Sequence, residues 1–128
     1  MRHTFLNNNN EGNLKRIGLE SLEKTKEAME AFMEDLEDNE DYGSFYEYGL
    51  ALDVVEDEDT QDIDYIRYQM SWGGPSDEVR FHTDGLIEYV YMDWSCGVGF
   101  DISRQDWAIW LKDMLMIEEM ETQHELAL

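Results

Sequence analysis

Residues 79–96, VRFHTDGLIEYVYMDWSC, decide the fold of this 128-residue chain. Two apolar runs flank the dipeptide Asp84-Gly85, which is typical of the tight turn of a β-hairpin. The first run predicts a short strand over residues 79–81, and the second predicts a longer strand over residues 86–96. An antiparallel hairpin therefore lies at the centre of the expected fold.

Two more strands are expected before this hairpin. Residues 46–54 and 63–72 alternate apolar and polar side chains, as half-buried strands do. Glycine, proline and serine at 73–76 supply the turn that ends the second of them. After residue 96, apolar side chains at 98, 100 and 102 leave open whether the sheet continues.

A helix is expected on each side of these strands. Ser21 predicts the N-cap of a helix over residues 21–38, which places its apolar side chains on one side. Ser103 and Asp106 resemble a capping box that opens a last helix reaching Met120. Short connections then predict an α+β fold of order α-β-β-β-β-α, an antiparallel four-stranded sheet with two helices packed on one face.

The length of the chain predicts one domain. Residues 14–128 contain every periodic segment and are expected to form this domain. Residues 1–13 include a run of four asparagines, show no periodicity, and are expected to form a flexible N-terminal arm.

The charge of the chain excludes several functions. It has 31 Asp and Glu against 9 Lys and Arg, for a formal net charge of −22. With so few cations we expect no direct binding of nucleic acid and none of anionic membranes. No apolar stretch approaches the roughly 20 residues of a membrane span, and the N-terminus lacks a signal-peptide core. Together with the single cysteine, Cys96, this predicts a cytoplasmic protein.

Carboxylates are concentrated in one part of the chain. Residues 27–66 contain sixteen acidic residues and no Lys or Arg. On the predicted helix, carboxylates recur about every 5 Å along one side, compared with about 3.4 Å between phosphates along one DNA strand. The first carboxylate group comprises the acidic residues on this side of the predicted helix together with Asp41, which follows the helix. Its members are Glu27, Glu30, Glu34, Glu37, Asp38 and Asp41. The second carboxylate group follows the first predicted strand: Asp53, Glu56, Asp57, Glu58, Asp59, Asp62 and Asp64.

A simple solvated surface is the ordinary interpretation of an acidic helix face. Such surfaces usually mix signs, because like charges four residues apart repel each other. In residues 27–66, no acidic side chain has a Lys or Arg within this run with which to form a local ion pair. We therefore predict that the two carboxylate groups form a binding surface for a basic protein, whose association the negative field would accelerate.

In size, charge and rows of carboxylates, the chain resembles the small acidic nucleic-acid mimics of phages and mobile elements, which inhibit restriction or CRISPR nucleases. The resemblance is compositional and covers mainly residues 20–64. It implies a non-enzymatic inhibitor, acting in a host cell if phage-encoded, that presents carboxylates where a basic nucleic-acid-binding protein or nuclease expects phosphates. A close variant is an immunity protein or antitoxin that neutralises a basic toxin without copying duplex geometry.

Other classes of function remain as alternatives. No calcium-binding EF-hand pattern fits loops starting at Asp35 or Asp57, and we predict no metal site and no cofactor. A small, metal-dependent enzyme would have to use His82 and Cys96 with nearby acids. Adaptation to high salt predicts acids over the whole surface, whereas residues 1–26 are net basic.

The predicted strand over residues 86–96 bears on whether two copies of this chain form a dimer. Tyr89 and Tyr91 must point to one face of the sheet, with Val90 and Met92 on the other. Helices are expected to cover only one of these faces. The other is exposed to a partner or pairs with a second copy, which makes a homodimer through an exposed sheet face possible.

Overall fold

Six antiparallel strands form one sheet, in the order β1-β6-β5-β4-β3-β2. The computed structural model describes residues 3–5, 11–71, 73–94 and 96–127. Five strands have six to eight residues, and β1 has three. The elements in chain order are β1 (His3–Phe5), α1 (Glu11–Glu34), α2 (Phe45–Tyr48), β2 (Ala51–Glu56), β3 (Ile63–Gln69), β4 (Pro75–His82), β5 (Ile87–Asp93), β6 (Cys96–Asp101), α3 (Asp106–Met114) and α4 (Ile117–Ala127).

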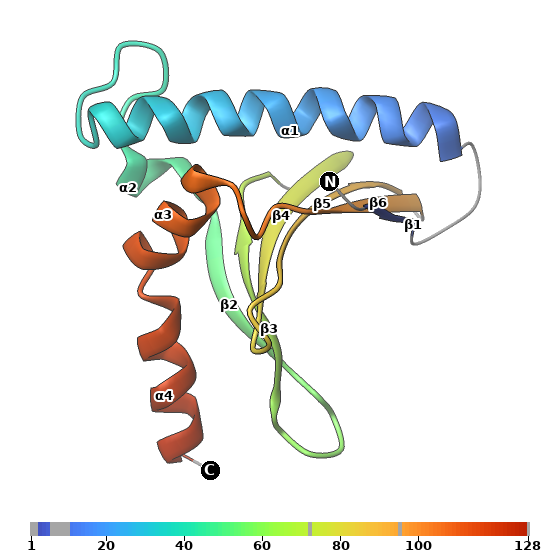
Figure 1. The fold of residues 1–128 in the computed structure, drawn as a ribbon, viewed down its shortest axis with the longest axis vertical. Coiled ribbons are helices and arrows are strands. Elements are labelled where there is room, and N and C mark those ends of the chain that lie inside the picture. Colours follow the sequence, from blue (N-terminus) through green and yellow to red (C-terminus); the bar gives the residue numbers. More distant parts are fainter. Residues whose placement is uncertain (1–2, 6–10, 72, 95, 128) are drawn as a thin grey trace.

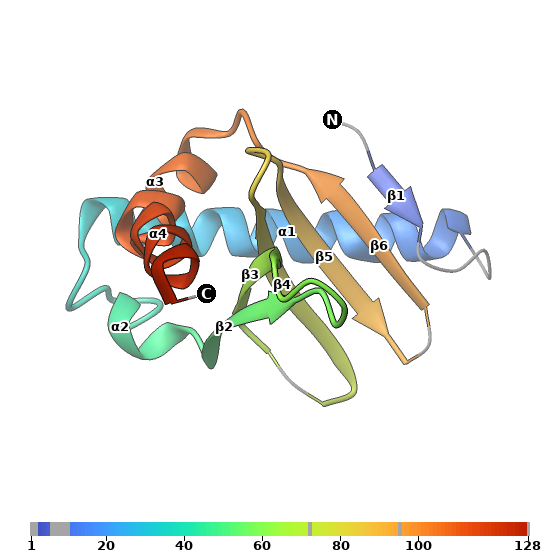
Figure 2. The same ribbon diagram turned by 90° about the horizontal axis from the view of Figure 1, so that it is seen from below.

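The longer helices lie on the same face of a strongly bent sheet. Figure 1 shows α1 across one arm of the sheet, with α3 and α4 beside the other arm. Figure 2 shows the opposite face, over which no described helix passes. The α+β class and the placement of helices on one face are therefore confirmed. The predicted number of four strands is wrong, because the chain continues the sheet through β6 and adds β1 at its edge.

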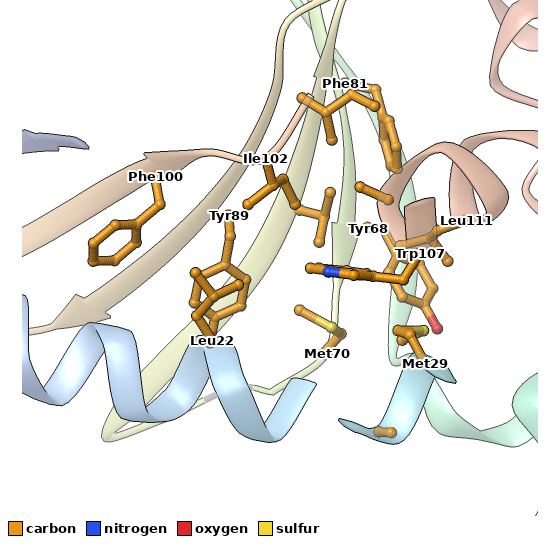
Figure 3. Close-up of a cluster of buried hydrophobic side chains, with 14 of the residues drawn as sticks. Leu22, Met29, Tyr68, Met70, Phe81, Tyr89, Phe100, Ile102, Trp107 and Leu111 are labelled. Carbon is orange, nitrogen blue, oxygen red and sulfur yellow. The ribbon is translucent and has the colours of Figure 1, made fainter. Parts of the chain in front are cut away.

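Strand register separates an apolar face from a polar one. Val79 pairs with Tyr89, and Tyr89 pairs with Phe100, so this buried row faces the helices. One position along, Glu78 pairs with Val90 on the uncovered face. Figure 3 shows the core between the layers, where α1 and α3 meet the sheet. Its large buried members include Leu22, Met29, Phe81, Tyr89, Phe100, Ile102, Trp107 and Leu111.

The predicted central hairpin is confirmed. Phe81 pairs with Ile87, and Gly85 has a φ of 96°, a conformation that glycine adopts without steric cost. Asp84 Oδ1 accepts a hydrogen bond from the backbone N–H of Leu86 at 3.0 Å, which closes the turn. The β4 strand is longer than expected, since it begins at Pro75.

The first helix differs from its prediction at both ends. It begins at Glu11, so Ser21 lies inside it and its hydroxyl contacts the Tyr89 hydroxyl at 2.6 Å instead of capping the helix. It ends at Glu34 because Asp35 Oδ1 accepts the backbone N–H groups of Glu37 and Asp38, at 3.3 and 3.1 Å. This local bonding competes with further helical turns.

The predicted strand over residues 46–54 is wrong in its first half. Ser44 Oγ accepts the backbone N–H of Tyr46 at 3.3 Å and caps the short helix α2. Strand β2 then begins at Ala51, and it extends to Glu56. A short amphipathic turn and a strand share the same alternation here, so periodicity does not separate them.

The predicted last helix is two helices. Met116 has a φ of 56°, and this left-handed residue separates α3 from α4. The expected capping box is also wrong, since α3 begins at Asp106. Ser103 Oγ instead accepts the backbone N–H of Ile87 at 2.8 Å, so it links the end of the sheet to β5.

Part of the expected N-terminal arm belongs to the fold. His3–Phe5 form β1 and pair with residues 98–100 of β6, and residues 11–13 form the first turn of α1. The folded unit therefore starts before residue 14. The asparagine run lies outside the described residues.

Candidate functional site

The C-terminal half of α1 presents three members of the first carboxylate group to solvent. Glu27, Glu30 and Glu34 are exposed, whereas Met29 and Phe32 on the opposite side are fully buried. The spacing of three and four residues places the carboxylates on one side of the helix. This part of the predicted row is present in the structure.

The remaining members of the first carboxylate group do not lie on the helix. Glu37, Asp38 and Asp41 are exposed in the loop after α1, so the expectation that these carboxylates continue the row along the helix is wrong. The loop is shaped by side chains that bond to the backbone: Asn39 Oδ1 accepts the N–H groups of Asp41 and Tyr42, at 3.0 and 3.2 Å. The row therefore turns at Glu34 instead of following one axis.

The second carboxylate group surrounds the β2–β3 connection. Asp57 Oδ1 accepts the N–H groups of Asp59 and Thr60, at 2.9 and 3.0 Å, and these bonds lower the pKa of the Asp57 carboxyl. The turn thus holds a carboxylate in its charged form. Its other exposed members are Glu56, Glu58, Asp59, Asp62 and Asp64.

Asp53 differs from the rest of the second carboxylate group. Asp53 Oδ2 accepts a 3.1 Å hydrogen bond from Arg67 Nη2 on the neighbouring strand β3. Glu56 Oε1 lies 3.7 Å from His124 Nε2. Within the described part of the chain, the other members of both groups form no ion pair. Most of this charge is therefore uncompensated.

The two carboxylate groups lie at opposite ends of the molecule. In Figure 1 the loop after α1 is at one end of the long axis, and the β2–β3 connection is at the other. The two groups do not form facing rows comparable to the strands of a duplex. A single partner that contacts both has to extend along the molecule.

Helix α4 adds carboxylates that the prediction missed. Glu118, Glu119 and Glu125 are exposed on this helix, which runs between the two ends in Figure 1. His124 Nε2 lies 3.0 Å from the backbone oxygen of Gln61 and ties α4 to the second carboxylate group. The signal was present in the sequence, since residues 118–125 contain four glutamates.

Like charges on α4 act on the partly buried carboxyl of Glu121. Burial raises the pKa of Glu121, and the neighbouring carboxylates of Glu118 and Glu125 raise it further, while Lys112 acts in the opposite direction. Glu121 Oε1 is buried and accepts no hydrogen bond from a described residue. This end of the molecule is therefore crowded with negative charge.

Most of the described cations flank the acidic regions. Lys15, Arg16, Lys24 and Lys26 precede the first carboxylate group on α1. Arg67 and Arg80 are on the uncovered face of the sheet, each in an ion pair. Lys26 and Arg104 line one pocket together with Glu30, so cations also lie at the edge of the first carboxylate group.

The pair of residues considered for catalysis is far apart. His82 ends β4 beside the central hairpin turn, and Cys96 begins β6 at the other end of β5. The separation is on the order of 20 Å, given the rise per residue in a strand. His82 Nε2 lies 2.8 Å from Glu88 Oε1 instead. Cys96 and His82 therefore do not act as a nucleophile and its base.

No three His, Cys, Asp or Glu side chains of the described chain are placed together to hold a metal ion. None of the described helices has the length and apolar character needed to cross a membrane.

The face of the sheet that the helices leave uncovered, through which a homodimer is possible, is polar. Tyr89 and Tyr91 face the helices, and Val90 lies on the other face, where the pairs Arg67–Asp53 and His82–Glu88 also lie. Trp94 is 87% exposed in the turn after β5, so it belongs to neither face. This polar surface offers little apolar area for a homodimer.

No protein-family model matches the chain, and no curated protein or solved structure matches it either. The distribution of charge is therefore the main guide to what the protein binds.

Proposed function

We propose that this protein is a non-enzymatic acidic inhibitor that binds a basic, nucleic-acid-binding protein and occupies the cations that would contact phosphates. The observation that supports it is that the carboxylates between Glu27 and Asp64, apart from Asp53 and Glu56, form no ion pair with a described residue, and that all of these unpaired carboxylates but the half-buried Asp57 are exposed. Exposed carboxylates without cations create a field that speeds association with a basic partner.

The first carboxylate group is the proposed primary contact. Glu27, Glu30 and Glu34 lie on a helix whose other side is buried, so their backbone positions are fixed before binding. The second carboxylate group and the acidic side of α4 extend the contact along the molecule. We infer a cytoplasmic setting and a partner that is a protein, with neither nucleic acid nor membrane bound directly.

One observation favours a variant of this proposal. The carboxylate row turns at Glu34, and the two groups lie at opposite ends of the molecule. An immunity protein or antitoxin needs complementary charge on a basic toxin but not the regular spacing of phosphates. Neutralisation of a basic nuclease or toxin is therefore our second candidate function.

Charge reversal on two helices tests the proposed contact. Glu34→Lys reverses one exposed carboxylate in the last turn of α1. Asp113→Lys is the matched control, since its side chain is exposed in the last turn of α3 and belongs to neither carboxylate group. The partner is first isolated at low salt and eluted with a salt gradient, and its affinity for each variant is then measured by calorimetry.

We expect the α1 variant to bind at least about tenfold more weakly and the α3 variant to bind nearly as wild type does. Duplex DNA should displace the protein from the partner. Equal affinities for the two variants would reject α1 as the contact. If the partner binds DNA and this protein at the same time, the protein does not compete with phosphates. Neutralisation of a basic toxin outside its DNA-binding surface would then be the supported function.

A further inference from the structure

Among the described residues, only hydroxyl groups donate hydrogen bonds to the Asp77 carboxylate on β4. Oδ2 accepts a hydrogen bond of 2.8 Å from the Tyr89 hydroxyl and a longer one of 3.4 Å from Thr25 Oγ1. Oδ1 accepts a short hydrogen bond from Ser71 Oγ. Asp77 forms no ion pair with any Lys, Arg or His in the described chain. Its negative charge is therefore oriented but not neutralised.

The groups around Asp77 are held rigidly by the fold. Tyr89 is fully buried, and Thr25 is 2% exposed. Because the Tyr89 hydroxyl donates to Asp77, it can accept from Ser21 Oγ, which lies 2.6 Å away. This chain of hydrogen bonds joins α1 to the sheet and fixes the carboxylate in place. A charge placed in this way is a prepared binding group.

A cavity of about 350 Å³ opens beside this carboxylate. Its walls come from α1, α2, the end of β3, β4 and β5, so it is formed by the main fold. Apolar and aromatic surface lies next to the charge. The lining residues are Ser21, Lys24, Thr25, Tyr48, Met70, Ser71, Pro75, Asp77 and Tyr91.

The field of Asp77 reaches the phenols of the cavity wall. The pKa of Tyr48 is raised by burial and then by the Asp77 charge. The pKa of Tyr91 is raised by burial, by Asp93 and, to a smaller extent, by Asp77. Negative potential in the cavity favours a positively charged ligand and opposes an anion.

We infer that this cavity binds an organic cation through an ammonium or guanidinium group. The charged group would pair with the Asp77 carboxylate, and the alkyl part would pack on Met70 and on the rings of Tyr48 and Tyr91. A metal ion fits less well, because Asp77 is the only His, Cys, Asp or Glu among the residues that line the cavity. The cation is either a free amine or a Lys or Arg side chain of a protein.

Lys24 lines the same cavity and is itself exposed. A bound cation would be repelled by its ammonium group. Replacing Lys24 with an uncharged residue should therefore strengthen binding, whereas replacing Asp77 should weaken it. These opposite effects separate a cation site from an anion site.

The test is a calorimetric titration of the full chain at constant ionic strength. One ligand is butylammonium chloride, and the others are the blocked peptides Ala-Lys-Ala and Ala-Arg-Ala. Asp77→Asn removes the charge and keeps an acceptor for Tyr89. Asp113→Asn is the control, because it removes the same charge from an exposed position on α3 that belongs to neither carboxylate group.

We expect D77N to bind about tenfold more weakly than wild type, D113N to bind as wild type, and Lys24→Gln to bind more tightly. Binding of butylammonium alone identifies a free amine as the ligand, and binding of either peptide identifies a protein side chain. Equal losses in D77N and D113N, or no binding to wild type, would overturn the inference. If D77N does not fold, K24Q decides the question, since unchanged or weaker binding contradicts a cation site.

The cavity shares no residue with the two carboxylate groups. Reversal of Glu34 should leave butylammonium binding in place, and D77N should leave the affinity for the basic partner in place if the ligand is a free amine. The inference and the proposed function can therefore fail separately.

Discussion

Arg80 Nε donates a 2.7 Å hydrogen bond to Glu78 Oε2, two residues earlier on β4, and the Arg80 guanidinium lies 4.6 Å from the centre of the Tyr65 ring. The two charged side chains are only 18% and 2% exposed. Glu78 is therefore a buried carboxylate whose one described ion-pair partner is Arg80. Removing one charge of a buried pair leaves the other uncompensated, which costs more than the pair itself contributes.

Arg80→Met is expected to lower the free energy of unfolding by about 3 kcal/mol. Urea denaturation at neutral pH measures it. Arg16→Met is the control, because both side chains of the Arg16–Glu20 pair are 60% exposed, and it should cost less than about 0.5 kcal/mol. The double variant Glu78→Gln, Arg80→Met should regain part of the loss. Equal effects of R80M and R16M would show that Glu78 is not compensated by Arg80.

Two glycines of α1 should respond in opposite ways to alanine. A Cβ on Gly18 would lie 2.7 Å from Val98 Cγ1 and 3.0 Å from Phe100 Cε2, whereas a Cβ on Gly12 would meet nothing within 4 Å. We expect G18A to destabilise the fold by about 1–3 kcal/mol through overpacking. G12A should stabilise it by up to about 1 kcal/mol through helix propensity. Thermal unfolding measures both, and a stabilising G18A would contradict close packing of α1 on β6.

The central hairpin could be predicted because its signals are local. The turn residues Asp84 and Gly85 and the alternation around them are sufficient to specify it. The sequence does not decide whether the sheet continues through β6, because glycines weaken the strand signal there. Only the pairing with β5 shows that they fit the sheet. The helix-facing side of the sheet follows from this register, not from the sequence alone.

The candidate site could be predicted only in part. Periodicity places Glu27, Glu30 and Glu34 on one side of a helix, as the structure has them. It does not show that Asp35 would bond to the backbone and end that helix, because such turns compete with the helix on nearly equal terms. The position of α4 and the Asp77 cavity depend on tertiary packing, so no sequence pattern indicates them.

Alkaline pH should unfold the protein through its buried tyrosines. Burial is the first cause that raises the pKa of both Tyr68 and Tyr89 above the ordinary value of 10.0. The folded state thus holds protons that the unfolded chain releases, so the stability from these groups is complete below about pH 10 and is lost as pH rises above it. Tyrosinate absorbance and circular dichroism should change together.

Tyr68→Phe checks this origin of the alkaline transition. The Tyr68 hydroxyl is buried and makes no hydrogen bond with a described residue, so its removal should not lower stability at neutral pH. The alkaline midpoint should move upward. Tyr46→Phe is the control, because Tyr46 is 65% exposed and should leave the midpoint in place. Tyrosinate absorbance that rises well before the fold is lost would contradict the prediction.

Salt should stabilise the folded protein. Folding gathers the second carboxylate group and the glutamates of α4 at one end of the molecule, and His124 joins the two segments there. Sodium chloride shortens the Debye length from about 30 Å at 10 mM to about 3 Å at 1 M, which screens this repulsion. We expect the Tm to rise by about 5 °C over that range, which corresponds to roughly 1 kcal/mol for a domain of this size.

Glu58→Gln combined with Asp59→Asn should reduce the rise, whereas Glu20→Gln should not, since Glu20 is paired with Arg16. A Tm that stays level in all three proteins would show that the charge is too dispersed to act as a concentrated binding surface.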